Sequence, residues 1–210
     1  MSSYAPTAGA ARVIGLTGGI ACGKSSVSQY LVSKGAYLLD ADSVGHRVIA
    51  PGGPGYAAVI GAFGQDIVAP NGSIDRRKLG EIVFGDPAQL QRLNGISHPT
   101  MARMMAEEIA AVRARRPAPP AILLDAALLY EAGWDALCDV VWAVTATGET
   151  AIARLMSRNQ LARDQAEARL AAQMEPAHKA ERADAVIPND GTLAELYGRV
   201  EALWAALPGA

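Results

Sequence analysis

The stretch Gly18-Gly-Ile-Ala-Cys-Gly-Lys-Ser25 fits the pattern G-x-x-x-x-G-K-[ST] at every fixed position. A short apolar run at residues 13–16 comes just before it, and a helical pattern that starts at Lys24 follows it. Glycines allow the backbone to curl so that successive N–H groups point at phosphates, and the helix N-terminus adds a partial positive charge. The stretch therefore predicts a phosphate-binding loop (P-loop) for a nucleoside triphosphate.

The residues of this loop have expected partners on the nucleotide. Lys24 is expected to bridge the β- and γ-phosphate oxygens, and the Ser25 hydroxyl to bind Mg²⁺. The rest of the loop is expected to contact the nucleotide through Gly18, Gly19, Ala21, Cys22 and Gly23. A chance Gly-rich turn with a solvated lysine is the alternative, and the combination of full pattern and strand–helix context disfavours it. We expect ATP with Mg²⁺ as cofactors and a small molecule as the phosphoryl acceptor.

The composition favours a single α/β domain. Half of the 210 residues are apolar, the formal net charge is −2 and the pI is about 5.9, which argues against a nucleic-acid binder. No membrane span is expected, because Asp125 and Glu131 interrupt the most apolar region. Cys22 and Cys138 are too few for a disulfide framework and fit a reducing compartment. We expect a cytoplasmic monomer or small homo-oligomer, with a flexible N-terminal tail at residues 1–11.

Alternating strand and helix patterns predict a five-stranded parallel sheet flanked by helices, the P-loop NTPase fold. The expected strands lack the polar–apolar alternation of half-exposed strands, and they cover residues 13–16, 36–39, 121–124, 140–144 and 185–187. Helical patterns cover residues 24–34, 90–115, 149–158, 163–173 and 193–207, the last after the capping-box pattern Thr192-x-x-Glu195. About eighty residues separate the second strand from the third, too many for one crossover. Residues 43–116 are therefore expected to form a helical subdomain for the second substrate, within one kinase domain at residues 12–210.

The second strand ends in Asp40-Ala41-Asp42, at the sheet edge where the P-loop is expected. A carboxylate there could serve as the base for an acceptor hydroxyl. Asp42 could instead be the N-cap of a helix that begins at Ser43, and one residue can do both. Asp40 could be an indirect partner of Mg²⁺.

The third strand has the Walker-B form, since an apolar run ends in Asp125. Such an aspartate assists Mg²⁺ directly or through water. A plain turn residue at a strand end is the alternative. Glu131 follows soon after, with Leu128 and Leu129 as candidates for the lining of an acceptor pocket.

Arg154 and Arg158 lie four residues apart and share one face of an expected helix. Two guanidinium groups would suit the charge that develops on a transferring phosphoryl group. A solvated helix face is the simpler alternative. The negative charge of a bound triphosphate must be offset, and the sequence has few other basic clusters. We therefore favour the interpretation that both arginines belong to a lid over the nucleotide, at residues 148–183.

Six segments in this order resemble the dephospho-coenzyme A kinase family over almost the whole chain. The first three begin at Ile14 (the P-loop with its Leu-Thr-Gly-Gly lead-in), Leu39 (Leu-Asp-Ala-Asp) and Ile74 (Ile-Asp-Arg-Arg-Lys-Leu). The next two begin at Ile96 (Ile-Ser-His-Pro) and Leu128 (Leu-Leu-Tyr-Glu). The sixth comprises residues 154–158 and, later in the chain, residues 183–189 (Ala-Asp-Ala-Val-Ile-Pro-Asn). The resemblance implies transfer of the ATP γ-phosphoryl group to the ribose 3′-hydroxyl of 3′-dephospho-CoA, which gives CoA and ADP in the last step of coenzyme A biosynthesis.

The resemblance also implies roles for individual residues. Asp42 is the expected base for the acceptor hydroxyl. Acceptor-binding residues are expected at Arg76, Arg77, His98, Leu128, Leu129 and Glu131, while Ser26 and Asn189 join the nucleotide-binding set. The chain departs from the family at Ala21, where a glycine is common, at Ser26 (Thr), at Ala127 (Pro) and at His46 (often Arg). None of these departures removes a catalytic group.

Overall fold

The structure is a computed structural model that describes residues 11–171 and 176–207. The chain forms two compact units. The first, here called the sheet unit, consists of Met1–Leu39 and Ile109–Ala210; the second, the helical unit, is Asp40–Glu108. The expected tail at residues 1–10 lies outside the described residues, whereas Ala11 is buried and its carbonyl accepts a hydrogen bond from Arg113.

The expected parallel sheet of five strands is confirmed. Its strands are β1 (Arg12–Gly18), β2 (Tyr37–Asp40), β3 (Ala121–Asp125), β4 (Val140–Thr145) and β5 (Ala185–Pro188), in the order β2-β3-β1-β4-β5. In the register of β1 with β3, Leu16 lies opposite Asp125, and in that with β4, Gly18 lies opposite Val144. The carboxyl ends of β1 and β3 therefore meet at one edge, where ligands of such sheets bind.

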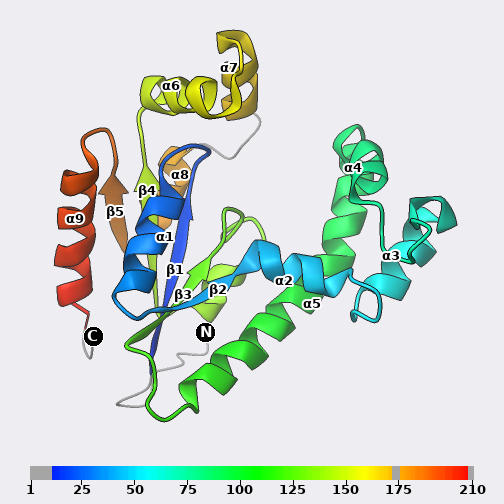
Figure 1. Ribbon diagram of the computed structural model, residues 1–210, viewed down its shortest axis with the longest axis horizontal. Coiled ribbons are helices and arrows are strands. Elements are labelled where there is room, and N and C mark those ends of the chain that lie inside the picture. The colour runs from blue at the N-terminus through cyan, green and yellow to red at the C-terminus, as the bar shows by residue number, and fades with distance from the viewer. Residues whose placement is uncertain (1–10, 172–175, 208–210) are drawn as a thin grey trace. The chain divides into compact units, whose positions relative to one another are not determined.

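Helices cover both faces of this sheet (Figure 1). On one face α1 (Lys24–Ser33) and α9 (Leu193–Ala205) pack against the strands in one apolar cluster that includes Ile14, Leu31 and Val200. On the other face α8 (Pro176–Arg182) contacts β4 and β1, and the short helix η2 (Trp134–Leu137) contacts β1. This burial explains why the strands read as continuous apolar runs.

The remaining helices of the sheet unit are α6 (Gly148–Asn159) and α7 (Arg163–Ala171). The helix expected at residues 163–173 thus ends at Ala171 within the described residues, and its last two positions lie outside them. α8 was not predicted, because its seven residues carry no clear apolar period. The capping box before α9 is confirmed, since Thr192 and Glu195 exchange the two expected hydrogen bonds.

The helical unit consists of four α-helices and one turn of 3₁₀ helix. They are α2 (Ala41–Val48), α3 (Tyr56–Phe63), η1 (Gln65–Ile67), α4 (Arg76–Phe84) and α5 (Pro87–Arg113), whose residues from Ile109 onward belong to the sheet unit. The core of the unit is a separate cluster built around Val59, Ile67, Ile74, Leu79 and Val83. Among the helices that the structure describes, none is long and apolar enough to cross a membrane.

Candidate active site

The P-loop joins β1 to α1 through a backbone conformation at Gly23 that strongly favours glycine. This residue is the N-cap of α1 and has φ +95°, in the left-handed region. A Cβ atom there would lie 2.1 Å from Nδ2 of Asn189. Gly18 is equally constrained, because its Cβ would lie 2.6 Å from the Val144 carbonyl oxygen. Both glycines therefore keep the loop close to the ends of β4 and β5.

The N-terminus of α1 fits phosphate groups. Among the described residues no side chain caps this helix, and its first N–H groups have no carbonyl four residues earlier to accept their hydrogen bonds. The Gly23 carbonyl accepts from the N–H groups of Ser26 and Val27, which closes the first turn. Ser25 lies exposed in that turn. The loop thus has the polar, glycine-lined shape that a triphosphate requires.

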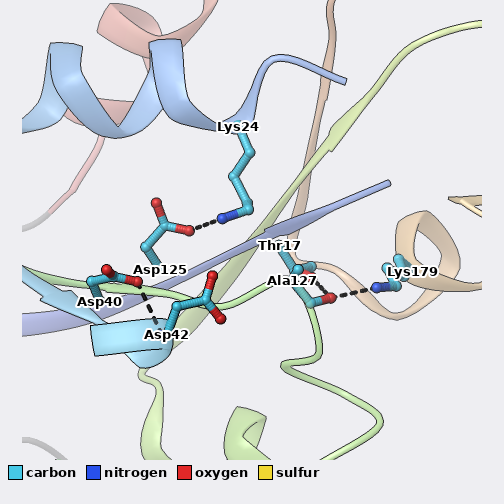
Figure 2. Close-up of polar contacts among 7 residues, drawn as sticks. All are labelled: Thr17, Lys24, Asp40, Asp42, Asp125, Ala127 and Lys179. Carbon is cyan, nitrogen blue, oxygen red and sulfur yellow. Dashed lines mark hydrogen bonds and ion pairs between the residues drawn. The ribbon is translucent and has the colours of Figure 1, made fainter. Parts of the chain in front are cut away.

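Lys24 and Asp125 form an ion pair where β3 ends and α1 begins (Figure 2). Their side chains are 23 % and 12 % exposed, so the pair is largely shielded from water. Asp125, the aspartate expected from the Walker-B pattern, therefore lies against the lysine of the P-loop pattern. Replacement of the carboxylate by phosphate oxygens would leave Lys24 with an equivalent partner.

Ser25 and Asp125 supply oxygen donors of the kind that Mg²⁺ prefers. Within residues 11–171 and 176–207, no three His, Cys, Asp or Glu side chains gather into a metal site. Nucleotide-bound Mg²⁺ usually takes only one or two carboxylates and completes its shell with phosphate oxygens and water. The residues present therefore fit this ion.

Two side chains from distant elements converge on the P-loop carbonyl of Cys22. Asn189 is 5 % exposed and donates from Nδ2 to this oxygen at 2.8 Å. Arg154 on α6 donates from Nη1 to the carbonyls of Ala21 and Cys22, both at 3.4 Å. Asn189 thus contacts the protein backbone of the loop, a contact that the resemblance did not imply.

Arg158 does not share the environment of Arg154. Its Nε donates to the neighbouring Asn159 at 2.9 Å in an exposed position. Of the two lid candidates, the structure brings only Arg154 to the P-loop.

An apolar cluster also joins α6 and α7 to the loop. Ile152, Leu155 and Ala166 are buried, and Ile20, Ala21 and Leu170 pack against them. Helices α6 and α7 of the expected lid region therefore contact the P-loop through these apolar side chains as well as through Arg154. Ala21 takes a left-handed φ of +55°, a conformation that glycine adopts more easily than alanine.

The segment after β3 holds the second group of sequence candidates. Leu128 is 45 % exposed, whereas Leu129 is fully buried and lies in the core beside Gly15. Glu131 pairs with Lys179 at 2.9 Å. Of the two candidate pocket leucines, Leu128 alone is open to solvent.

The helical unit begins with Asp40 as the N-cap of α2. Its Oδ1 accepts a hydrogen bond from the N–H of Asp42 at 3.1 Å, and the helix starts at Ala41 (Figure 2). The alternative that made Asp42 the N-cap of a helix starting at Ser43 is therefore wrong. Because the cap comes two residues earlier, Asp42 lies exposed in the first helical turn with its carboxylate available for another role.

A cavity of about 770 Å³ lies in the helical unit. Asp42 and His46 from α2, and Arg76 and Arg77 from α4, contribute polar groups to its lining. Its apolar side comes mainly from Ile49, Leu79, Val83, Phe84, Leu93 and Met101. Such a mixture, in a volume typical of small-molecule sites, fits a ligand with both apolar and anionic parts.

His98 lies on α5, and the residues of this helix that line the cavity are Leu93, Ser97 and Met101. Burial lowers the pKa of its imidazole, which favours the neutral form. The structure thus places His98 near the cavity in sequence but not in its lining.

Two polar residues of the sheet unit were missed by sequence reasoning. Lys179 lies on the unpredicted helix α8 with 2 % of its surface exposed, and Thr17 donates to the Ala127 carbonyl at 3.3 Å. Neither has a local pattern that marks it, since their partners lie 52 and 110 residues away.

Known proteins match this chain along most of its length. A sequence model of the family described as dephospho-CoA kinase matches residues 12–195. A dephospho-CoA kinase from Symbiobacterium thermophilum is 45 % identical over 198 residues, which are 94 % of this chain and 82 % of that protein.

Solved structures agree with this match. The structure titled TT1252 from Thermus thermophilus has a TM-score of 0.78 and 34 % identity, covering 95 % of this chain and 100 % of that one. Dephospho-CoA kinase from Campylobacter jejuni has a TM-score of 0.68 and 25 % identity, covering 91 % and 94 %. With its P-loop, its Walker-B aspartate and these matches, the chain belongs to the dephospho-CoA kinase family.

Proposed function

We propose that this chain transfers the γ-phosphoryl group of ATP to the ribose 3′-hydroxyl of 3′-dephospho-CoA, giving CoA and ADP. This is the last step of coenzyme A biosynthesis. The observation that carries the proposal is the complete P-loop with its Lys24–Asp125 pair, inside a family match that spans residues 12–195. We propose the cytoplasm as the compartment, which suits the free thiols of Cys22 and Cys138.

Lys24 and the N-terminus of α1 bind the β- and γ-phosphates in this scheme. With nucleotide bound, Lys24 would exchange the Asp125 carboxylate for phosphate oxygens, and Asp125 and Ser25 are the residues that would hold the metal. Bound Mg²⁺ supplies positive charge that offsets the charge of the phosphates. Gly18, Gly19, Ala21, Cys22, Gly23 and Ser26 complete the nucleotide-binding set.

Asp42 accepts the proton of the acceptor hydroxyl. Its exposed position in the first turn of α2, with the capping role taken by Asp40, supports this assignment. The Asp40 carboxylate caps the helix with Oδ1, and its second oxygen would assist the metal directly or through water.

The acceptor is held by the cavity of the helical unit. Arg76 and Arg77 offer guanidinium groups to its anionic parts, and the apolar lining suits its uncharged arm. Leu128 and Glu131 of the sheet unit, and His98 on α5, remain candidate contacts to the same substrate.

Arg154 stabilises charge on the transferring group, since it already lies at the P-loop carbonyls of Ala21 and Cys22. Arg158 would need to leave Asn159 to take part. Residues 148–183 act as the lid in this scheme.

An ADP-release assay tests the proposal. ADP formation from ATP–Mg²⁺ is measured with 3′-dephospho-CoA and, separately, with AMP, uridine and shikimate as competing acceptors. We expect release to depend on 3′-dephospho-CoA and on none of the others. Equal release with AMP or shikimate would identify a kinase of different specificity. Slow release that no acceptor accelerates would point to a nucleotide-dependent switch.

A further inference from the structure

Lys179 is the one charged side chain among the described residues that is buried almost completely, at 2 % exposure. Burial of an ammonium group costs free energy unless hydrogen-bonding partners of opposite polarity surround it. No step of the proposed reaction uses this residue. We therefore ask which groups contact the buried ammonium and what its contacts hold in place.

The partners of Lys179 all lie in the segment that follows β3. Its Nζ donates to the Ala127 carbonyl at 2.5 Å and pairs with Oε1 of Glu131 at 2.9 Å. The same Ala127 carbonyl accepts from the hydroxyl of Thr17, which is adjacent to the P-loop (Figure 2). One ammonium group thus links α8 to two points on a five-residue stretch.

Other contacts hold this stretch besides Lys179, and one of them also comes from α8: the guanidinium of Arg182 lies 4.0 Å from the centroid of the Tyr130 ring. The N–H of Ala126 still donates to Leu16 in the sheet at 3.0 Å. Beyond that point the hydrogen bonds become local, as from Ala132 to Leu128 at 3.0 Å and from Trp134 to Leu129 at 2.9 Å. Leu129 anchors the apolar side of the turn in the core, and Lys179 holds the opposite side that carries Glu131.

We propose that Lys179 is a positioning residue for acceptor binding, which acts by fixing the Ala127 carbonyl and the Glu131 carboxylate. Because α8 lies at the end of the proposed lid region, the contact also ties the base of that region to the acceptor-binding turn. The inference rests on the proposed function, in which this turn contacts the acceptor.

The nucleotide side is held independently of Lys179. Asp125 is fixed by its register opposite Leu16, and its carboxylate pairs with Lys24. Loss of Lys179 should therefore move the turn at residues 127–131 while the P-loop keeps its shape. This separation predicts that loss of Lys179 raises KM for 3′-dephospho-CoA and leaves KM for ATP nearly unchanged.

Steady-state kinetics of Lys179→Met test the proposal, at a temperature well below the melting point of each variant. Methionine keeps the length and volume of the stem and removes the charge. We expect KM for 3′-dephospho-CoA to rise about tenfold or more and KM for ATP to change less than about twofold. The control is Lys34→Met, which breaks an exposed pair with Glu201 at 2.7 Å and should leave both KM values unchanged.

Glu131→Gln in both backgrounds shows whether Lys179 acts through this carboxylate. We expect Glu131→Gln alone to raise KM for 3′-dephospho-CoA, and to add less than about twofold to the KM of Lys179→Met, because both changes remove the same pair. Multiplicative effects would overturn action through Glu131. An unchanged KM for 3′-dephospho-CoA in Glu131→Gln overturns the proposal even if Lys179→Met does not fold.

The remaining outcomes are distinct. A lower melting temperature of Lys179→Met with wild-type kinetics, or equal increases in both KM values, would show a structural role only and overturn the inference. If the wild-type protein itself forms no ADP in response to 3′-dephospho-CoA, the proposed function fails, not the positioning role alone.

Discussion

At the residue scale, the absence of a side chain at Gly23 determines how closely the P-loop packs against Asn189. Gly23 combines a φ of +95° with direct contact to Asn189, and Asn189 in turn donates to the Cys22 carbonyl. The loop conformation therefore depends on a glycine and on an asparagine 166 positions later (189 − 23). A side chain at residue 23 would disturb both.

Gly23→Ala should strongly lower the affinity for ATP. The left-handed φ costs a non-glycine residue about 1–2 kcal/mol, and the added Cβ would push Asn189 off the Cys22 carbonyl. We expect KM for ATP to rise at least about tenfold. Gly52→Ala is the matched control, since Gly52 has φ +79° with nothing within 4 Å of its Cβ position, and it should lower only the melting temperature. Wild-type KM for ATP in Gly23→Ala would refute the packing argument.

The activities of Asp40→Asn and Asp42→Asn should respond differently to the concentration of Mg²⁺. Asp42→Asn cannot accept a proton, and the helix keeps its cap at Asp40, so we expect a normal melting temperature, a normal KM for ATP and a kcat lowered about 10²–10⁴-fold. Asp40→Asn retains a capping oxygen, and raised Mg²⁺ should partly restore its activity.

Single-turnover transfer across a Mg²⁺ titration distinguishes the two variants. If Asp42→Asn transfers at the wild-type rate, or if only Asp40→Asn is inactive at saturating metal, the base has been assigned to the wrong carboxylate.

At the scale of elements, helix starts and strand ends carry the site. α1 begins at the P-loop, β3 ends at Asp125, and α2 begins beside Asp42. α4 begins with Arg76 and Arg77 behind the cap of Asp75, whose side chain accepts from the N–H groups of Arg77 and Lys78. This cap holds the first turn of α4 at the cavity wall.

Substitution of Arg76 or Arg77 on α4 should weaken binding of the acceptor but not binding of ATP. Arg76→Ala and Arg77→Ala are expected to raise KM for 3′-dephospho-CoA about tenfold and to leave KM for ATP unchanged, because both side chains line the cavity of the helical unit. Arg103→Ala is the control, since it breaks an exposed pair with Glu107 at 3.0 Å outside the cavity lining. Equal changes in both KM values would contradict the proposal that the acceptor binds in this cavity.

At the scale of the whole molecule, we expect ATP to bind the sheet unit, while the main cavity proposed for the acceptor lies in the helical unit. The P-loop and Asp125 belong to the sheet unit, and the cavity with Arg76 and Arg77 belongs to the helical unit. Each unit also has its own apolar core. A ligand that binds one unit should therefore stabilise that unit first.

Amide hydrogen exchange measures this stabilisation unit by unit. At a concentration about 100 times its Kd, a ligand adds about 2.7 kcal/mol against openings that destroy its site. ATP–Mg²⁺ alone should slow exchange in α1 and β3 but not in α4, and 3′-dephospho-CoA alone should slow exchange in α4 but not in α1. Equal protection of α4 by ATP–Mg²⁺ alone would contradict the assignment of separate sites.

Local chemistry explains what was predicted from the sequence. The P-loop, the strand positions and the capping box of Thr192 and Glu195 each arise from residues a few positions apart, so their pattern is visible in the linear chain. Boundaries were less accurate. α5 starts at Pro87 rather than at residue 90, because residues before the apolar period can still extend a helix.

The sequence by itself therefore determined the nucleotide loop, the parallel sheet and the family to which the chain belongs. Tertiary structure alone decided that Lys24 pairs with Asp125, that Asn189 supports the Cys22 carbonyl and that Lys179 holds Glu131. The physical reason is that a side-chain hydrogen bond depends on distance in space. These partners come together only when strands and helices far apart in the sequence pack around one sheet.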